Sequence, residues 1–401
     1  MKSLRFLQEL PGLVDGIRKQ RDLIIANILL IGQTPSEPVV KKSDELEIEN
    51  ININLRKKLF IERLLEVGVG ESSVDAHGNP IGLVKGKGNG NSRKGIIAAA
   101  HLDTAIPITD EVNYNVGVDT ISGPGIIDNS VSIGILISLP EIIKNLDLGF
   151  SMDVFLVGFP DTLGKANLSS ARNFINSWPF PVCGAICLEG AELGRLEYFS
   201  DGMIRAEISC DIPMTTGWEN RFGVNAILII NEVINQIMAI EMPQRPKTFI
   251  TIGKISGGMK HGDLALSAAL GLEIQSSSDS VVRSLYSRIG DIVESIAFEN
   301  RVALRLSKIS DVSAVRLGYD HPLVKSSIKV LNALEIEPII GSSQSEMSLF
   351  LGKGIPAVTI GLTHGENYHM ENASIEIEPL FRGIAQLLGI MMAIDRGVCD
   401  E

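Results

Sequence analysis

Residues 98–107 read AAAHLDTAIP, and this stretch decides the fold. It closes an apolar run, KGIIAAAHL (94–102), which is typical of a buried strand. His101 and Asp103 stand two positions apart at the end of that run, so their side chains share one face of the strand. Asp103 is then placed to accept the free N–H of His101 and to fix its tautomer, as a metal-bound imidazole requires. The alternative for a lone His-x-Asp pair is a histidine that is hydrogen-bonded at a strand end.

Strand-like and helical patterns alternate on both sides of this stretch. The expected strands are 78–86, 94–102, 151–159, 183–190 and 354–361. The expected helices are 3–31, 53–67, 129–146, 167–178, 321–334 and 378–396, and the Gly/Asn-rich segment 87–93 is an expected turn. This alternation predicts an α/β fold with a mixed, mainly parallel sheet flanked by helices.

The pattern changes near residue 203. Four expected strands and two expected helices follow: strands 203–212, 247–255, 266–277 and 301–309, and helices 223–240 and 280–300. Two helices on one antiparallel sheet make a ferredoxin-like α+β unit. The α/β pattern resumes from about residue 313. We therefore expect a domain made of residues 1–202 and 313–401, with residues 203–312 inserted into it as a second domain.

The composition of the chain limits the classes of molecule that it is expected to bind. The chain has 401 residues and a formal charge of −12, from 36 basic and 48 acidic residues, and its longest basic cluster is RKK (56–58). Nucleic acid is therefore not an expected partner. The four cysteines are best interpreted as inert buried thiols. The N-terminal segment lacks the pattern of a signal peptide and no run approaches the length of a membrane span, so we expect a cytoplasmic protein with no membrane partner.

Further acidic and histidine side chains follow other expected strands or turns. Asp128 follows the glycine-rich turn in GPGIIDNS (123–130), Glu189 ends a strand in CLEGAELG (187–194), and His364 and His369 follow the strand GIPAVTIG. An Asp before a helix is most often an N-cap. However, side chains at the carboxyl ends of parallel strands converge on one crevice. Nitrogen and oxygen ligands of this kind suit zinc, with cobalt or manganese as alternatives.

These motifs resemble, along nearly the whole chain, the co-catalytic zinc exopeptidases and deacylases. That family includes acetylornithine deacetylase, succinyl-diaminopimelate desuccinylase, carboxypeptidase G, aminoacylase and peptidase T. The resemblance rests on HLDT, GPGIID, LEGAELG, FGVNAI (222–227) in the inserted domain, and GIPAVTIG followed by YH. It implies that the larger domain is catalytic and that the inserted domain is a lid or dimerisation domain.

The resemblance also implies a role for each matching residue. His101 and Glu189 match ligands of the first metal, Asp103 matches the carboxylate that orients His101, and Asp128 matches the ligand that bridges two metals. His369 matches a second-metal ligand. Two further residues are implied as neighbours of the substrate site, His364 and Glu346.

The chain departs from this family in VGFPDTLG (157–164). The family places a Glu-Glu pair here, a general base followed by a second-metal ligand, whereas residues 151–185 contain no Glu. Asp161 then matches the base and Thr162 matches the ligand. A neutral hydroxyl is a poorer zinc ligand than a carboxylate, so we expect one firmly bound zinc and a second that is weak or absent. In the inserted domain, Thr215 stands near the usual substrate-contacting His, and His261 is a candidate substitute for a missing polar contact or a surface turn residue.

Two functions remain open from the sequence. The first is a metal-dependent hydrolase of peptide or N-acyl amide bonds, whose substrate is a small peptide or an N-acyl amino acid. The second is a catalytically inactive relative that serves as a binding or dimerisation module. The resemblance also implies a homodimer formed through the inserted domain.

Overall fold

A computed structural model describes residues 5–36, 51–88, 94–105, 108, 112–163, 166–213 and 223–399, with the side chains of 51–54 left out. The chain divides into two compact units. Unit 1 comprises Met1–Phe199 and Arg316–Glu401, and unit 2 comprises Ser200–Val315. The boundaries expected from the sequence, 203 and 312, both fall inside unit 2. Most of the expected turn 87–93, the glycine that ends VGFPDTLG and Thr215 lie outside the described residues.

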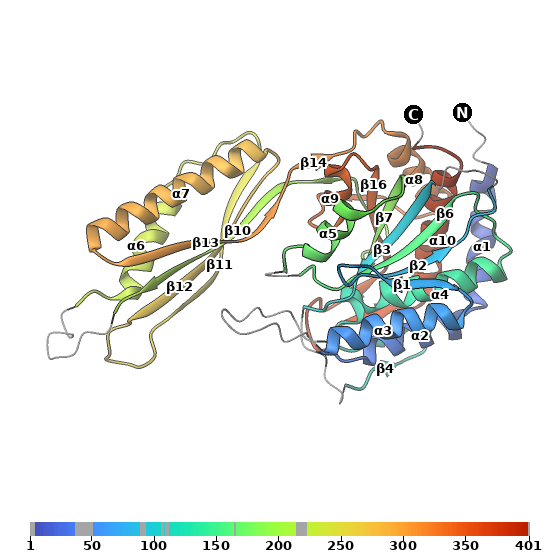
Figure 1. Cartoon of the computed structure of the whole chain (residues 1–401), viewed down its shortest axis with the longest axis horizontal. Helices are drawn as coiled ribbons and strands as arrows, with labels where there is room; N and C mark the ends of the chain where they lie inside the picture. The colour runs from blue at the N-terminus through green and yellow to red at the C-terminus, as the bar shows by residue number, and fades with distance from the viewer. Residues whose placement is uncertain are drawn as a thin grey trace. The chain divides into compact units, whose positions relative to one another are not determined.

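Unit 1 is built on an eight-stranded sheet with the order β1-β2-β6-β3-β7-β16-β8-β15 (Figure 1). Its strands are β1 (Glu71–Val74), β2 (Pro80–Val84), β3 (Gly95–His101), β6 (Asp153–Phe159), β7 (Val182–Ala191), β8 (Arg195–Glu197), β15 (Ile339–Gly341) and β16 (Ala357–Thr363). The four central strands, β6, β3, β7 and β16, are all parallel. Towards the edges, β1, β2 and β8 introduce antiparallel pairs. The expected mixed, mainly parallel sheet is thus confirmed.

Burial on both faces explains why β3 is continuously apolar. Ile96 and Ala98 pack into one hydrophobic cluster, whereas Ile97 and Ala99 pack into another on the opposite face. Successive side chains of a strand point to opposite faces, so a strand covered on both sides needs an apolar residue at every position. The run ends at His101, where the sheet gives way to the polar loop that follows.

Helices cover both faces of this sheet. The first cluster draws on α1 (Leu10–Arg18), α2 (Arg21–Gln33), α3 (Ile51–Glu66), α4 (Val131–Asn145), α8 (Pro322–Ala333) and α10 (Glu378–Asp395). The second draws on α5 (Ser169–Ser177) and α9 (Met347–Gly352). The single helix expected over 3–31 is instead a 3-10 turn, η1 (Arg5–Gln8), followed by α1 and α2. The break falls at Gln20, whose φ of −103° and ψ of 18° lie outside the helical region.

One core segment has the length and composition of a membrane span. Ile126–Asn145 has a mean hydropathy of 1.6, contrary to the expectation that no run approaches that length, and 89% of it is buried inside the fold. It combines a π-helical turn, η2 (Ile126–Ser130), with α4. Its burial explains the composition, because a helix that is apolar all round belongs to the core of a large domain.

Short elements with little apolar sequence complete unit 1. They are β4 (Asn115–Val116), β5 (Thr120–Ser122), β17 (Gly365–Glu366) and β18 (Ser374–Glu376), which form a second sheet. A separate two-stranded ribbon pairs β9 (Phe199–Ser200) with β14 (Val315–Arg316). The second sheet pairs β18 with β5 and so brings the segment after β16 next to the segment before η2.

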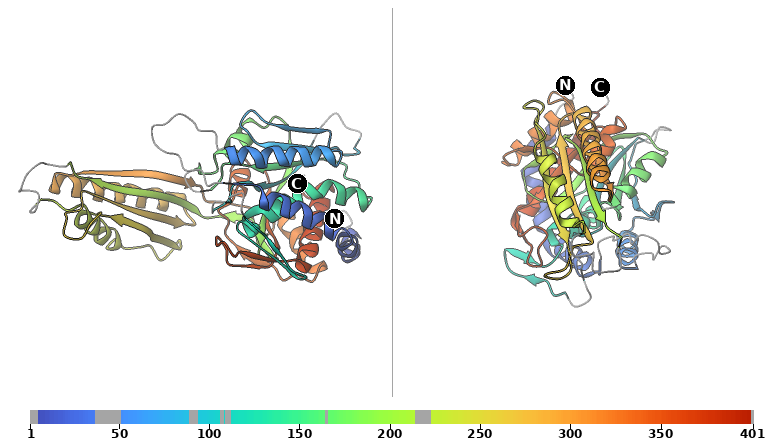
Figure 2. Two further views of the ribbon diagram at one scale, coloured as in Figure 1. Left: turned by 90° about the horizontal axis from the view of Figure 1, so that it is seen from below. Right: turned by 90° about the vertical axis from the view of Figure 1, so that its left-hand side faces the viewer.

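Unit 2 is an antiparallel sheet with the order β11-β12-β10-β13, with two helices packed on it. Its elements are β10 (Gly202–Asp211), α6 (Ala226–Met238), β11 (Thr248–Gly257), β12 (Ser267–Ser276), α7 (Asp279–Asn300) and β13 (Ala303–Val312). Figure 2, in the right-hand view, shows α6 and α7 side by side on one face of the sheet. The strand β11 is an edge strand, and most of its residues are exposed.

Candidate metal centre

Three side chains from separate elements of unit 1 meet beside the carboxyl ends of the central strands. His101 is the last residue of β3 and is 4% exposed. Glu189 lies near the end of β7, the strand next to β3. Asp128 lies in η2, directly after the turn that contains Gly125, whose φ of 65° favours glycine. The carboxyl ends of parallel strands form the crevice where α/β folds bind ligands.

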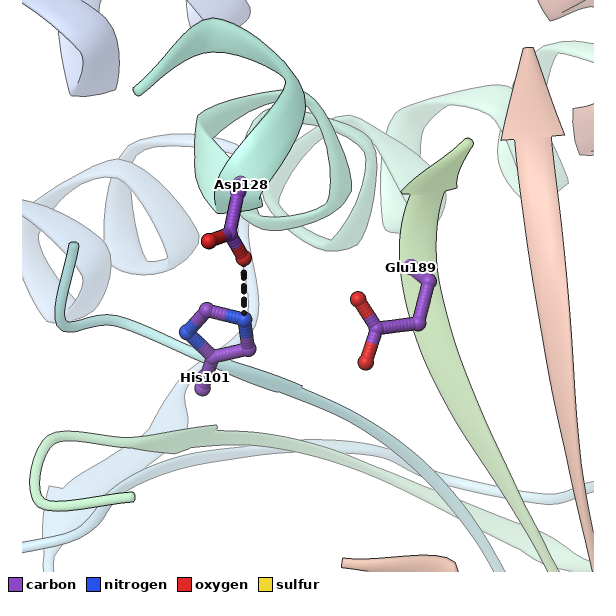
Figure 3. Close-up of side chains that lie close together, drawn as sticks. All are labelled: His101, Asp128 and Glu189. Carbon is purple, nitrogen blue, oxygen red and sulfur yellow. Dashed lines mark ion pairs between the residues drawn. The ribbon is translucent and has the colours of Figure 1, made fainter. Parts of the chain in front are cut away.

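The donor atoms of these three residues are close enough to share one cation. The Nε2 atom of His101 lies 2.9 Å from Oδ1 of Asp128. One ligand atom from each of His101, Asp128 and Glu189 lies within 4.8 Å of the others. Figure 3 shows the Glu189 carboxylate on β7 turned towards the pair formed by His101 and Asp128.

Backbone-directed hydrogen bonds hold this arrangement in place. The side-chain amide of Asn129 donates to the carbonyl of Leu188 at 2.9 Å. Because Asn129 follows Asp128 and Leu188 precedes Glu189, this bond fixes the two acidic residues beside each other. On the other side, Nδ1 of His101 lies 2.9 Å from the backbone carbonyl of Asp103 and 3.4 Å from Oδ1 of its carboxylate. The carbonyl is therefore the closer acceptor, where the sequence suggested the carboxylate, and Nε2 is left to face Asp128.

The Asp103 carboxylate is instead the anchor of the turn after β6. Thr162 donates its hydroxyl to Oδ1 at 2.6 Å and its backbone N–H to Oδ2 at 2.9 Å. The backbone N–H of Leu163 also donates to Oδ2, at 2.8 Å. Thr162 is 5% exposed, so these bonds lie away from solvent. Thr162, which matches a second-metal ligand of the resembling family, is thus hydrogen-bonded to the carboxylate of Asp103.

His369 approaches Asp128 from the loop after β17. Its Nδ1 atom lies 3.0 Å from Oδ2 of Asp128, and its side chain is 59% exposed. The neighbouring Asp128 carboxylate raises the pKa of His369. The 3.0 Å separation is that of an ion pair, yet no donor hydrogen is aligned with this buried oxygen. Asp128 therefore presents one oxygen to each imidazole, as a bridging ligand does, and keeps one oxygen without an aligned donor.

Burial and the neighbouring charges shift the pKa values of His101, Asp128 and Glu189 in opposite directions. Burial raises the pKa of Glu189 to about 7, although the charge on His101 opposes it. Burial also disfavours the charged forms of Asp128 and His101, but their mutual attraction wins, so the pKa of Asp128 is lowered and that of His101 is raised. One imidazole and two carboxylates, each offering a ligand atom within 4.8 Å of the others, fit a divalent ion such as zinc, cobalt or manganese.

The remaining candidates occupy different positions. Glu346 is 3% exposed at the start of α9, and burial raises its pKa although the charge on His101 opposes the shift. His364 forms an ion pair with Glu192, and both are partly exposed. The backbone of Asp161 is tied to Ser170 by three hydrogen bonds. His261 is exposed on the loop between β11 and β12 of unit 2, so its role stays a prediction.

Sequence reasoning missed one charged residue beside this site. Arg56 opens the basic triplet RKK, to which no role at the site was assigned from the sequence, and it is fully buried. The available signal was its place in the helical pattern, because Arg56, Phe60 and Leu64 recur at intervals of four and therefore share one face of α3. Phe60 and Leu64 are also fully buried.

The comparisons with known proteins agree with this fold. No protein-family model and no curated protein match the chain. Among solved structures, a dipeptidase from Saccharomyces cerevisiae superposes with a TM-score of 0.77 at 12% identity, over 97% of this chain and 99% of that chain. A tripeptidase from Staphylococcus aureus gives 0.73 at 17% identity, over 94% and 99%. A Bacillus subtilis protein described as a dinuclear metal-binding peptidase of the M20 family gives 0.62 at 12% identity, over 93% and 98%. The likeness establishes that the chain has the fold of these metallopeptidases, as the resemblance implied.

Proposed function

We propose that the chain is a metal-dependent hydrolase of peptide or N-acyl amide bonds. The observation that carries the proposal is the meeting of His101, Asp128 and Glu189 within 4.8 Å at the carboxyl ends of the central strands. These residues would hold one firmly bound zinc, with cobalt or manganese as alternatives. The fold, shared with peptidases along nearly the full length, supports the same reaction class. The proposed substrate is a small peptide or an N-acyl amino acid.

A bound metal would supply Lewis acidity to polarise the scissile carbonyl and would lower the pKa of water. The protein residues have separate tasks. Asp103 holds Nδ1 of His101, so that Nε2 faces the cation site. His369 approaches the second oxygen of Asp128 and is exposed enough to exchange with solvent. Asp161 is the proposed general base, because it is the only acid in the loop that follows β6.

The number of metals follows from the same contacts. A second metal would bind at Oδ2 of Asp128 and at His369, and in the resembling family it would also need a carboxylate at position 162. Thr162 provides no carboxylate, and its hydroxyl donates to Asp103. The proposed site therefore holds one metal firmly and a second one weakly or not at all.

We also propose that unit 2 serves homodimerisation. Edge strand β11 exposes Phe249 to 49% and Ile255 to 61%. An exposed edge strand presents unpaired backbone groups and is a template for pairing with another chain. Ile255→Lys is expected to convert a dimer to a monomer in analytical ultracentrifugation. A wild-type chain that is monomeric at micromolar concentration would contradict this proposal.

Metal analysis combined with a hydrolysis screen tests the enzyme against an inactive binding module. The chain is loaded with zinc, cobalt or manganese in turn and assayed with dipeptides, tripeptides and N-acyl amino acids. The expected result is about one tightly bound metal per chain and turnover that Asp161→Asn abolishes without loss of metal. A chain that binds metal but hydrolyses no substrate with any metal would instead support the inactive relative.

A further inference from the structure

Arg56 is the largest fully buried side chain among the described residues, with 0% exposure. It lies on the same face of α3 as Phe60 and Leu64, which belong to the larger hydrophobic cluster. Burying a guanidinium is costly unless its donors are satisfied. The hydrogen-bond partners of Arg56 should therefore show the structural role of this buried charge.

Two of the three hydrogen bonds of Arg56 reach the two segments that carry the proposed metal ligands. Nη1 donates to the backbone carbonyl of Leu102 at 2.9 Å, and Nη2 donates to the hydroxyl of Ser130 at 3.3 Å. Leu102 stands between His101 and Asp103, and Ser130 is two residues after Asp128. The third donor, Nε, lies 3.1 Å from the carbonyl of Thr34 at the end of α2. One side chain thus joins the end of β3 to the turn of η2.

All three acceptors of Arg56 are neutral, and among the described residues no carboxylate forms an ion pair with it. Burial lowers the pKa of Arg56 to about 10, against the opposing charges of Tyr114 and Asp103, so the group remains a cation at neutral pH. The acids around the metal centre are themselves buried or partly buried, namely Asp103, Asp128, Glu189 and Glu346. The fixed charge of Arg56 attracts the Asp103 carboxylate, which is one of these acids.

We propose that Arg56 is a positioning residue of the metal centre. Its fork of donors holds the His101 segment and the Asp128 segment at the separation that a divalent cation needs, and its charge attracts the Asp103 carboxylate. The inference rests on the proposed metal site, because it assigns an outer residue to that site.

The charge of Arg56 and its hydrogen bonds have opposite effects on metal affinity. Measuring the affinity of an Arg56 variant therefore shows which effect is larger. A buried cation repels a metal ion, so removing the charge of Arg56 would tighten metal binding if repulsion were the larger effect. Loss of the three hydrogen bonds would instead let the two segments separate and would weaken binding. Substitution of residues that orient metal ligands typically costs about 10–100-fold in metal affinity. We expect the second effect to win, because both ligand-bearing segments depend on the same guanidinium.

The test titrates Zn²⁺ and Co²⁺ into the metal-free full-length chain by calorimetry. Arg56→Met is expected to weaken binding by about 10–100-fold. Arg56→Lys, which keeps the charge and loses the fork, is expected to lie between Arg56→Met and wild type. The visible spectrum of bound Co²⁺ should change in both variants, which a purely structural role for Arg56 would not require. Arg63→Met is the matched control, since Arg63 lies on the same helix and donates to Asn27; it should leave the affinity and the spectrum unchanged.

Each outcome has one interpretation. Wild-type affinity or tighter binding in Arg56→Met would overturn the inference while the proposed metal site stands. If Arg56→Met does not fold, Arg56→Lys decides, and an affinity and Co²⁺ spectrum identical to wild type would overturn it. A wild-type chain that takes up no metal would refute the proposed function, and the role of Arg56 with it.

Discussion

Replacing Thr162 with valine separates a hydrogen-bonding role from a metal-binding role. In the structure, the Thr162 hydroxyl donates to Oδ1 of the buried Asp103 carboxylate at 2.6 Å. A hydrogen bond to a charged group contributes about 1.5–3 kcal/mol, and valine has nearly the same shape as threonine, so no cavity adds to the loss. We therefore expect Thr162→Val to destabilise unit 1 by about 2 kcal/mol. With an m value of about 3 kcal/mol/M, the urea midpoint should fall by about 0.7 M.

Fluorescence of Trp178 reports this transition, because it is the only tryptophan in unit 1. The control is Ser327→Ala, which removes a buried but neutral hydrogen bond to the carbonyl of Leu323. The control should cost about 1 kcal/mol and leave metal affinity unchanged. Thr162→Val should weaken zinc binding by about tenfold, because Asp103 orients His101.

The number of metals bound per chain tests whether Thr162 is a donor to Asp103 or a metal ligand. If wild type binds two metals tightly and Thr162→Val binds one, Thr162 is a ligand and its interpretation as a donor to Asp103 is wrong. If Thr162→Val matches the Ser327→Ala control in both stability and zinc affinity, the hydroxyl does not hold Asp103 as the geometry indicates.

Three further perturbations test the site and the core. Zinc binding must displace protons from Glu189, with a pKa of about 7, and from His101, whose pKa is raised. The affinity for zinc should therefore decrease as the pH is lowered. Between pH 8 and pH 6 the loss should be about tenfold from Glu189 alone, and calorimetry that finds no change would contradict these pKa shifts. Asp128→Asn should abolish zinc binding and lower the pKa of His101 in an NMR titration; retained binding would remove Asp128 from the ligand set. Phe174→Ala, in a fully buried position 4.6 Å from the Trp178 ring, should cost about 3–5 kcal/mol in urea unfolding; a change below about 1 kcal/mol would mean that this side of the sheet is loosely packed.

The parts of the fold that the sequence predicts well are those with one dominant physical cause. β3 was expected because burial on both faces demands a continuous apolar run, and it starts and ends within a residue of the expected 94–102. β1 and β15 were missed, since they are short and largely exposed. Such edge strands exist only because a neighbouring strand pairs with them. The break near Gln20 was missed because it falls in the polar run RKQRD (18–22), which also fits the exposed face of one continuous amphipathic helix.

The candidate site divides in the same way. His101, Asp128 and Glu189 were identifiable because each follows an apolar run or a glycine turn in the local sequence. The partners of Arg56 and Thr162 were not, because Arg56 contacts Leu102, 46 positions away, and Thr162 contacts Asp103, 59 positions away. Nothing local to either residue encodes such a contact. A threonine in place of an expected carboxylate could be noticed from the sequence, but the carboxylate to which it donates could not.

The insertion of unit 2 has a consequence for biosynthesis. A ribosome completes all of unit 2, Ser200–Val315, before it makes β16 and α10, which belong to unit 1. Until then β7 lacks β16, one of its two parallel neighbours, and the sheet formed by the first 199 residues has an unpaired edge at β7. Domains generally fold as units as they emerge, so unit 2 can be native while unit 1 is still incomplete. The nascent chain therefore carries His101, Asp128 and Glu189, the three ligands of the proposed firm metal site, well before His369 is made.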